Sequence, residues 1–223
     1  MIDALRISTG EIRRIYDRRS RNYARTTGRL ERRAHRRALQ LAEVAPGDRV
    51  LEVAVGPGTT LVEILARVDR ANVVHGVDIS PGMLEQAARA AAAAGYDNFE
   101  LKEADARQLP YPDQSFDLVY NGYMLDLIPL RDIPVVLGEF RRVLRPGGRL
   151  VLVHMSKRDP DKITWFERLY GMLPERLAPR ILGLCRPVVL ESWVRDAGFV
   201  AARREFVGGL MPSEIIVARR PLA

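Results

Sequence analysis

Short apolar segments alternate with helix-like segments through the middle of this chain. None of the five apolar runs between residues 49 and 155 is longer than seven residues. Strands joined by helices run parallel through right-handed crossovers, and short apolar strands are typical of a sheet that is covered on both faces. This rhythm therefore predicts an α/β fold with a mainly parallel sheet. The expected strands are residues 49–55, 73–78, 99–103, 116–121 and 149–155.

Segments at both ends extend this pattern. Residues 199–207 and 213–219 supply two more expected strands, after a short helix at 189–197. Residues 1–44 predict one or two basic helices that act as a lid, and the aromatic-rich residues 157–187 predict a helical cap inserted at the sheet edge. The 223 residues fit one domain, so we expect residues 1–223 to form a single seven-stranded unit with these two additions.

The net charge of +7 is confined to the start of the chain. Residues 1–50 contain 13 arginines and 6 acidic residues, whereas basic and acidic residues balance in the rest. The basic segment could be a solvated helix face, a contact with an anionic membrane surface, or an RNA contact. A single cysteine and the lack of any signal-length or membrane-spanning apolar run predict a soluble, cytoplasmic protein.

A glycine turn follows the first expected strand. Gly56 and Gly58 let the backbone come close to a ligand, and ligands of parallel sheets bind beyond the carboxyl ends of the strands. Asp78 ends the second expected strand, where a carboxylate can accept hydrogen bonds from both ribose hydroxyls of an adenosyl group. The dinucleotide-binding pattern needs a third glycine at position 61, which is Leu61. A ligand-free turn and a helix-capping carboxylate remain the alternatives.

These segments resemble the class I S-adenosylmethionine-dependent methyltransferases. Glu52 precedes the turn as that family's acidic residue does, although Ala54 replaces its first glycine. Stretches 80–84, 103–106, 109–119 and 144–150 also resemble the family, in order and spacing. The resemblance implies a Rossmann-like fold with S-adenosylmethionine as cofactor. Together with the strand ends, it gives these cofactor-binding candidates: Tyr16, Tyr23, Glu52, Ala54, Gly56, Gly58, Asp78, Ile79, Met83, Asp105, Ala106 and Asn121.

The resemblance also assigns roles. It implies that Met83 packs on adenine and that Asp105 accepts a hydrogen bond from the adenine amino group. Within the family, the N-terminal segment resembles the lid of the ubiquinone and menaquinone biosynthesis methyltransferases, in which a tyrosine such as Tyr16 or Tyr23 closes over the methionine carboxylate. We therefore expect methyl transfer to a small, apolar, lipid-like or quinone-like acceptor.

Two titratable residues near strand ends are catalytic candidates. His154 ends the fifth expected strand and has a pKa range suited to a general base, or it is a hydrogen-bonded structural histidine. Asp126 lies among apolar residues, where a carboxylate is costly unless it is paired, so it is either a base or a cap. Asn121 does not open the Asn-Pro-Pro-Tyr motif of nucleobase amine methylation, because Gly122 follows it.

The sequence leaves two rival functions open. An RNA methyltransferase would use the arginine-rich N-terminus, although no appended RNA-binding motif is visible. A non-catalytic protein would keep the cofactor site without turnover. We expect no metal and no nucleic acid partner, while contact with an anionic membrane and oligomer formation both stay open.

Overall fold

The computed structural model describes residues 9–23, 27–157, 172, 186–209 and 211–222. Seven strands form one sheet in the order β3-β2-β1-β4-β5-β7-β6, and β7 is antiparallel to its two neighbours while the other pairs are parallel. This arrangement confirms the predicted Rossmann-like α/β fold. The strands are β1 (Val50–Val53), β2 (Val74–Asp78), β3 (Phe99–Glu103), β4 (Phe116–Gly122), β5 (Leu144–Met155), β6 (Val200–Val207) and β7 (Ser213–Arg219).

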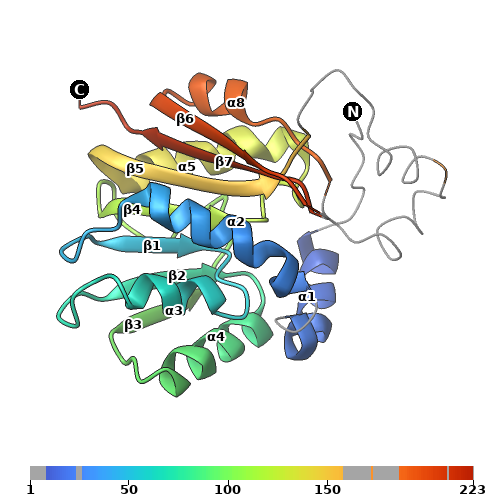
Figure 1. Ribbon diagram of the computed structural model, residues 1–223, viewed down its shortest axis with the longest axis vertical. Helices are drawn as coiled ribbons and strands as arrows, with labels where there is room; N and C mark the ends of the chain where they lie inside the picture. The colour runs from blue at the N-terminus through green and yellow to red at the C-terminus, as the bar shows by residue number, and fades with distance from the viewer. Residues whose placement is uncertain (1–8, 24–26, 158–171, 173–185, 210, 223) are drawn as a thin grey trace.

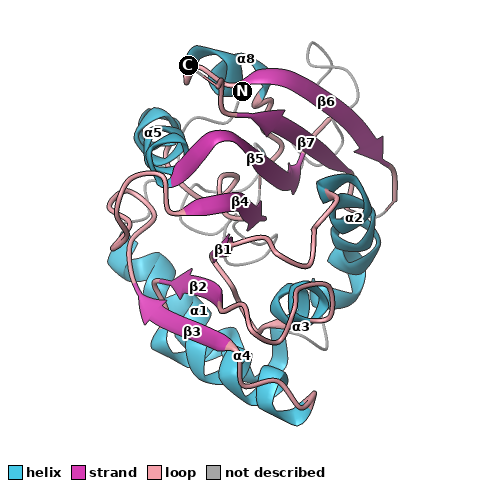
Figure 2. Ribbon diagram, turned by 90° about the vertical axis from the view of Figure 1, so that its left-hand side faces the viewer, coloured by secondary structure: helices cyan, strands magenta, loops and turns pink. Residues whose placement is uncertain are grey.

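Helices cover both faces of the sheet (Figures 1 and 2). Successive side chains of a strand point to opposite faces. Along β4, Leu118 and Tyr120 therefore join one core, while Val119 joins the other. The helices over the first core are α2 (Thr27–Ala42), α3 (Thr59–Leu65) and α4 (Pro81–Ala93), and those over the second are α5 (Ile133–Val143) and α8 (Glu191–Asp196), with a short 3-10 helix at Leu130–Asp132 before α5.

Capping chemistry places α4 directly after the second strand. Ser80 is the N-cap, and its hydroxyl accepts a hydrogen bond from the Met83 amide at 3.1 Å. Pro81 occupies the first helical turn, where its fixed φ suits the helix and no amide donor is lost. This cap positions Met83 beside the strand ends.

Three of the predicted elements have clearly different bounds in the structure, the first being β1, which spans Val50–Val53 instead of residues 49–55. β5 begins at Leu144 instead of residue 149, because the turn around Gly147 pairs with the C-terminal segment through the Gly147 amide and the Arg220 carbonyl at 2.9 Å. The helix expected at residues 189–197 is shorter and spans only α8. The cap expected at residues 157–187 lies almost entirely outside the described residues.

The helix α1 (Thr9–Tyr23) lies beyond the carboxyl ends of β1 and β2, beside α4 (Figure 1). The Asp17 carboxylate accepts hydrogen bonds from the Ser80 hydroxyl and from the Gly82 amide, the latter at 3.2 Å. Arg13 forms an ion pair with Glu103 at 2.8 Å. These contacts hold α1 over the edge of the sheet where ligands of this fold class bind.

Candidate functional site

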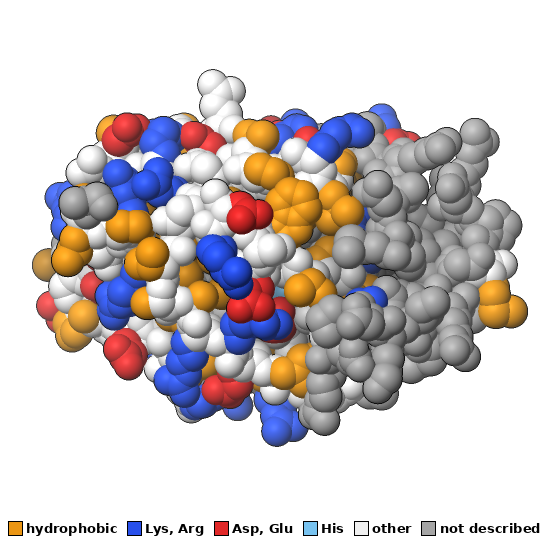
Figure 3. Space-filling model, turned by 90° about the horizontal axis from the view of Figure 1, so that it is seen from above, with side chains coloured by type: hydrophobic (Ala, Val, Ile, Leu, Met, Phe, Trp, Pro, Cys, Tyr) orange, Lys and Arg blue, Asp and Glu red, His pale blue; other side chains and the backbone are white. Residues whose placement is uncertain are grey.

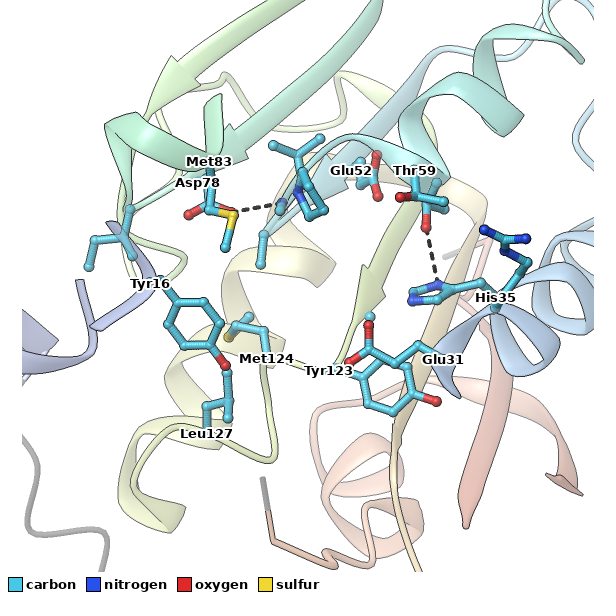
Figure 4. A pocket seen from close by; sticks show the side chains of 18 of the residues that line it. Tyr16, Glu31, His35, Glu52, Thr59, Asp78, Met83, Tyr123, Met124 and Leu127 are labelled. Atoms are coloured by element: carbon cyan, nitrogen blue, oxygen red, sulfur yellow. Dashed lines mark hydrogen bonds between the residues drawn. The ribbon is translucent and has the colours of Figure 1, made fainter. Parts of the chain in front are cut away.

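Two adjoining cavities open at the carboxyl ends of the central strands. The first extends from Asp78 toward α2, and Figure 4 shows Asp78 and His35 on opposite sides of it. The second extends from Asp78 toward Asp105 and the start of α5. A molecule that bridges both cavities must therefore pass Asp78. The residues that line both are Ile12, Ala54, Asp78, Ile79, Met124 and Leu127.

The two glycines of the β1–α3 turn have different surroundings. Both have positive φ angles, +54° at Gly56 and +84° at Gly58. A Cβ on Gly58 would lie 2.6 Å from the Ala87 Cα atom, so Gly58 allows α3 to pack against α4. A Cβ on Gly56 would meet nothing within 4 Å. Gly56 lines the first cavity and Gly58 lines neither. Gly58 therefore serves helix packing, whereas Gly56 leaves the backbone open toward the cavity.

Asp78 connects this turn to the start of α4. Its Oδ2 accepts a hydrogen bond from the Gly56 amide and its Oδ1 accepts one from the Ser80 amide, both at 2.9 Å. Burial raises the pKa of Asp78 to about 6, against the opposing effect of these backbone amides. A carboxylate has about four acceptor positions, so Asp78 keeps capacity for a further donor in the cavities that it lines.

Glu52 is a buried carboxyl group in the wall of the first cavity. Only 3% of its surface is exposed, and its Oε2 atom has no hydrogen-bond partner among the described residues. Burial, together with the nearby Asp78 carboxylate, raises the pKa of Glu52 well above its ordinary value. A buried carboxyl oxygen without a partner is costly. A ligand with a polar or cationic group would therefore fit beside it.

The second cavity has a charged end. Both Asp105 oxygens contact the Arg107 guanidinium, the shortest contact being 2.6 Å, and Arg107 also reaches Asp132 at 3.2 Å. Burial opposes ionisation, but the Arg107 guanidinium outweighs it and lowers the pKa of Asp105. Asp105 and Ala106 both line this cavity. Asp105 is therefore an ionised acceptor whose oxygens are partly engaged.

The predicted cofactor residues fall into three groups. Two candidates line neither cavity: Gly58, and Asn121, which is 1% exposed and donates from its amide to the Val53 carbonyl at 2.9 Å. Tyr23 is the last residue of α1, and its side chain lies outside the described part of the chain. The others line a cavity, namely Tyr16, Glu52, Ala54, Gly56, Asp78, Ile79, Met83, Asp105 and Ala106.

The two catalytic candidates lie in a buried charged cluster and line neither cavity. Asp126 has no exposed surface, its Oδ2 accepts a hydrogen bond from the Met155 amide at 3.1 Å, and burial raises its pKa to about 6. His154 is 1% exposed, and its Nε2 lies 3.3 Å from Glu214. Their contacts with Met155 and Glu214 are consistent with a structural role for both residues. A catalytic role for either residue remains a prediction.

Sequence reasoning did not identify the end of the first cavity that faces α2. Figure 4 shows the Glu31 and His35 side chains of α2 and the Tyr123 ring pointing into this region. Glu31 and His35 are four positions apart, so they share a helix face. This spacing could have indicated a polar pair on one helix face, but the many arginines around it favoured a solvent-exposed helix. Tyr123 follows β4 with a φ of +52°, and its hydroxyl lies 2.6 Å from the Ser213 hydroxyl.

Metal-binding and membrane-spanning features are absent from the part of the chain that the structure describes. No group of three His, Cys, Asp or Glu side chains there could hold a metal ion. None of the helices in those ranges combines the length and the apolar character of a membrane-spanning segment.

Comparisons with known proteins agree on one family. Residues 50–148 match the family model described as "Methyltransferase domain". A demethylmenaquinone methyltransferase from Symbiobacterium thermophilum is 37% identical over 152 residues, which cover 66% of this chain and 59% of that protein. The aklanonic acid methyltransferase DauC from Streptomyces sp. (strain C5) is 32% identical over 191 residues, which cover 84% of this chain and 86% of that protein.

A solved structure shows the same fold over nearly the whole chain. The crystal structure of the cyclase SpnF superposes with a TM-score of 0.77 at 20% identity, and the match covers 97% of both chains. At this level of identity, the likeness concerns the fold alone.

Proposed function

Because the chain belongs to the class I S-adenosylmethionine-dependent methyltransferases, we propose that it methylates a small, apolar, quinone-like acceptor. The position of Asp78 between two cavities is the observation that carries the cofactor part of this proposal, since an adenosyl group has its ribose between two unlike ends. One cavity would hold the base, and the other would hold the sulfonium and the amino-acid tail.

The residues fit such a cofactor. Asp78 would accept hydrogen bonds from the ribose hydroxyls, and Asp105 and Ala106 would border the adenine in the second cavity. The unpartnered Glu52 oxygen would receive a donor from the tail, and Gly56 leaves the backbone open there. When bound, the cofactor supplies an electrophilic methyl group that a nucleophile takes by in-line displacement. The contribution of the chain is to align the two reactants and exclude water.

The character of the first cavity wall supports an apolar acceptor. Apolar and aromatic side chains from α1 and from the segment after β4 face the space beyond Asp78 (Figure 4). Such a surface would exclude water and pack against a planar, apolar molecule. The name of the Symbiobacterium relative, a demethylmenaquinone methyltransferase, points to the same acceptor class. The residues that form this wall are Ile12, Tyr16, Tyr123, Met124 and Leu127.

Ion pairs engage part of the basic N-terminal segment within the fold. Arg37 contacts Glu205 on β6 at 2.5 Å, and Arg36 lies 3.6 Å from Glu63 on α3. These pairs reduce the free charge that an RNA methyltransferase would need, so we favour the small-molecule acceptor. Contact of the remaining arginines with an anionic membrane stays a prediction.

Calorimetry with S-adenosylhomocysteine and a methylation assay test the proposal. We expect Asp78→Asn to weaken cofactor binding by about tenfold to a hundredfold, because charged hydrogen bonds contribute about 1.5–3 kcal/mol. Glu85→Gln, which changes an exposed residue of α4, should leave binding unchanged. Demethylmenaquinone reduced to its quinol should gain a radiolabelled methyl group. Binding without methylation of this quinol would contradict the acceptor assignment, and methylation of RNA would replace it.

A further inference from the structure

His35 occupies the end of the first cavity opposite Asp78, and the proposed function gives it no role. Its side chain enters the cavity from α2 (Figure 4). A Cβ on Gly122 would lie 2.5 Å from the His35 Cε1 atom, so the imidazole lies directly against the backbone at the end of β4. The Tyr123 ring meets it edge-on, with 5.3 Å between the ring centroids. The imidazole is therefore enclosed by backbone and aromatic side chains.

Two hydroxyl groups contact the same nitrogen of this ring. The Tyr120 hydroxyl lies 2.7 Å from His35 Nδ1, and the Thr60 hydroxyl lies 3.2 Å from it. Tyr120 has no exposed surface, and Nδ1 is the only hydrogen-bond partner of its hydroxyl among the described residues. A buried hydroxyl that does not donate costs about 1–3 kcal/mol. The Tyr120 hydroxyl therefore donates to Nδ1.

This contact determines the tautomer of His35. Burial raises the pKa of Tyr120 well above its ordinary value, so the phenol keeps its proton. Burial also lowers the pKa of His35 to about 4, so the ring is neutral near pH 7. A neutral imidazole that accepts at Nδ1 carries its hydrogen on Nε2. Among the described residues, Nε2 has no hydrogen-bond partner of its own, and it is therefore available to a ligand in the cavity.

We propose that His35 is a fixed, neutral hydrogen-bond donor whose Nε2–H binds an oxygen atom of the bound ligand. The proposal rests on the proposed function, because it takes the first cavity as the place where cofactor and acceptor meet. Two oxygens share the required chemistry: a carboxylate oxygen of the cofactor's amino-acid tail, and a hydroxyl or carbonyl oxygen of the acceptor. In either case His35 orients a reactant and does not remove a proton, because its Nδ1 lone pair is occupied.

Matched substitutions at His35 test the donor. His35→Phe keeps a flat ring without nitrogen atoms, whereas His35→Gln places an amide donor near the position of Nε2. His75→Phe is the control, because that ring packs against Tyr111 and Phe116 outside both cavities. Calorimetry uses S-adenosylhomocysteine and 5′-methylthioadenosine, which lacks the amino-acid tail. The methylation assay uses the demethylmenaquinone quinol.

Each oxygen predicts its own result. If His35 binds the cofactor tail, His35→Phe weakens S-adenosylhomocysteine binding about tenfold and leaves 5′-methylthioadenosine binding unchanged. If it binds the acceptor, both affinities stay unchanged and the KM for the quinol rises about tenfold at constant kcat. His35→Gln should recover most of either loss. The proposal is overturned if none of these quantities changes by more than twofold, or if 5′-methylthioadenosine binding falls equally.

Imidazole nitrogen NMR of the cofactor-free protein gives a test that needs no acceptor. We expect His35 Nε2 to carry the hydrogen in the parent protein, and Tyr120→Phe to introduce the other tautomer. A parent ring protonated at Nδ1 would overturn the proposal. The two proposals can also fail separately. If the quinol is not methylated, but the tautomer is as predicted and His35→Phe selectively weakens S-adenosylhomocysteine binding, the quinone acceptor is contradicted and the role of His35 stands.

Discussion

Ala54 adopts a backbone conformation that favours glycine. Its φ is +60°, and left-handed backbone costs a non-glycine residue about 1–2 kcal/mol. Glycine would remove this strain, but it also increases the conformational entropy of the unfolded chain, which lowers the stability by about 0.4–1 kcal/mol. We therefore expect Ala54→Gly to stabilise the protein by about 0.5 kcal/mol, measured by urea unfolding. Gln114→Gly, at an exposed turn with a φ of +56°, should give a similar gain. A loss of more than about 1 kcal/mol would show that the Ala54 methyl group contributes essential packing.

Asp126 should make stability depend on pH. Burial raises its folded pKa to about 6, above the value of about 3.9 in an unfolded chain. Folding therefore favours the protonated form, and this stabilisation is complete below about pH 4 and is lost as the pH rises through 6. The Asp126→Asn side chain stays neutral at every pH. Relative to the parent, the free energy of unfolding of this variant should therefore rise by about 1–3 kcal/mol when the pH is raised from 5 to 8, as measured by urea unfolding at both pH values.

The same variant distinguishes a structural aspartate from a catalytic one. A structural role predicts that Asp126→Asn keeps kcat within about threefold, because the side chain lines neither cavity. A loss of more than a hundredfold in kcat, with an intact fold and unchanged S-adenosylhomocysteine binding, would instead support the base that sequence reasoning suggested. An unchanged stability difference between pH 5 and pH 8 would show that Asp126 does not titrate in this range.

At the scale of elements, the two glycines of the β1–α3 turn differ in role, since Gly58 permits helix packing and Gly56 leaves space beside the cavity. Gly58→Ala would place a Cβ 2.6 Å from the Ala87 backbone, so we expect a loss of about 2–3 kcal/mol as α3 and α4 separate. Gly56→Ala has open space and should cost only about 1 kcal/mol for its positive φ, while weakening S-adenosylhomocysteine binding. Thermal unfolding and calorimetry on both variants measure these effects. Equal losses of stability would contradict this division.

The elements were largely predictable because their signals are local. The apolar runs and the glycine turn each lie within a few residues, so the sheet could be predicted directly, and nine of the twelve cofactor candidates line one of the two cavities. The wall around His35 could not be predicted, because its contacts join positions 25 and 85 residues apart. Asn121 shows a second limit. Its place at a strand end was predicted, but its amide turns toward the Val53 carbonyl.

At the scale of the whole molecule, ion pairs are spread over the described surface, and one of them joins α1 to the end of β3. The face in Figure 3 shows basic and acidic side chains interspersed, in keeping with the neutral balance after residue 50. The basic α1 instead contacts acceptors at the strand ends through Arg13 and Glu103. The exposed fractions of these two side chains are 42% and 46%, so the ion pair contributes at most about 1 kcal/mol. The contacts of Asp17 with α4 are therefore the stronger restraint on α1.

Removing Asp17 should loosen α1 without unfolding the sheet. Asp17→Ala deletes the acceptor for the Ser80 hydroxyl and the Gly82 amide, while Ser80 still caps α4. We expect faster hydrogen exchange in α1, little change in the melting temperature, and severalfold faster release of S-adenosylhomocysteine, because Ile12 and Tyr16 of α1 line the cavity. Glu85→Ala, which breaks an exposed pair within α4, is the control. If release is unchanged while α1 exchanges faster, α1 is not the element that retains the cofactor, and retention must depend on the strand ends themselves.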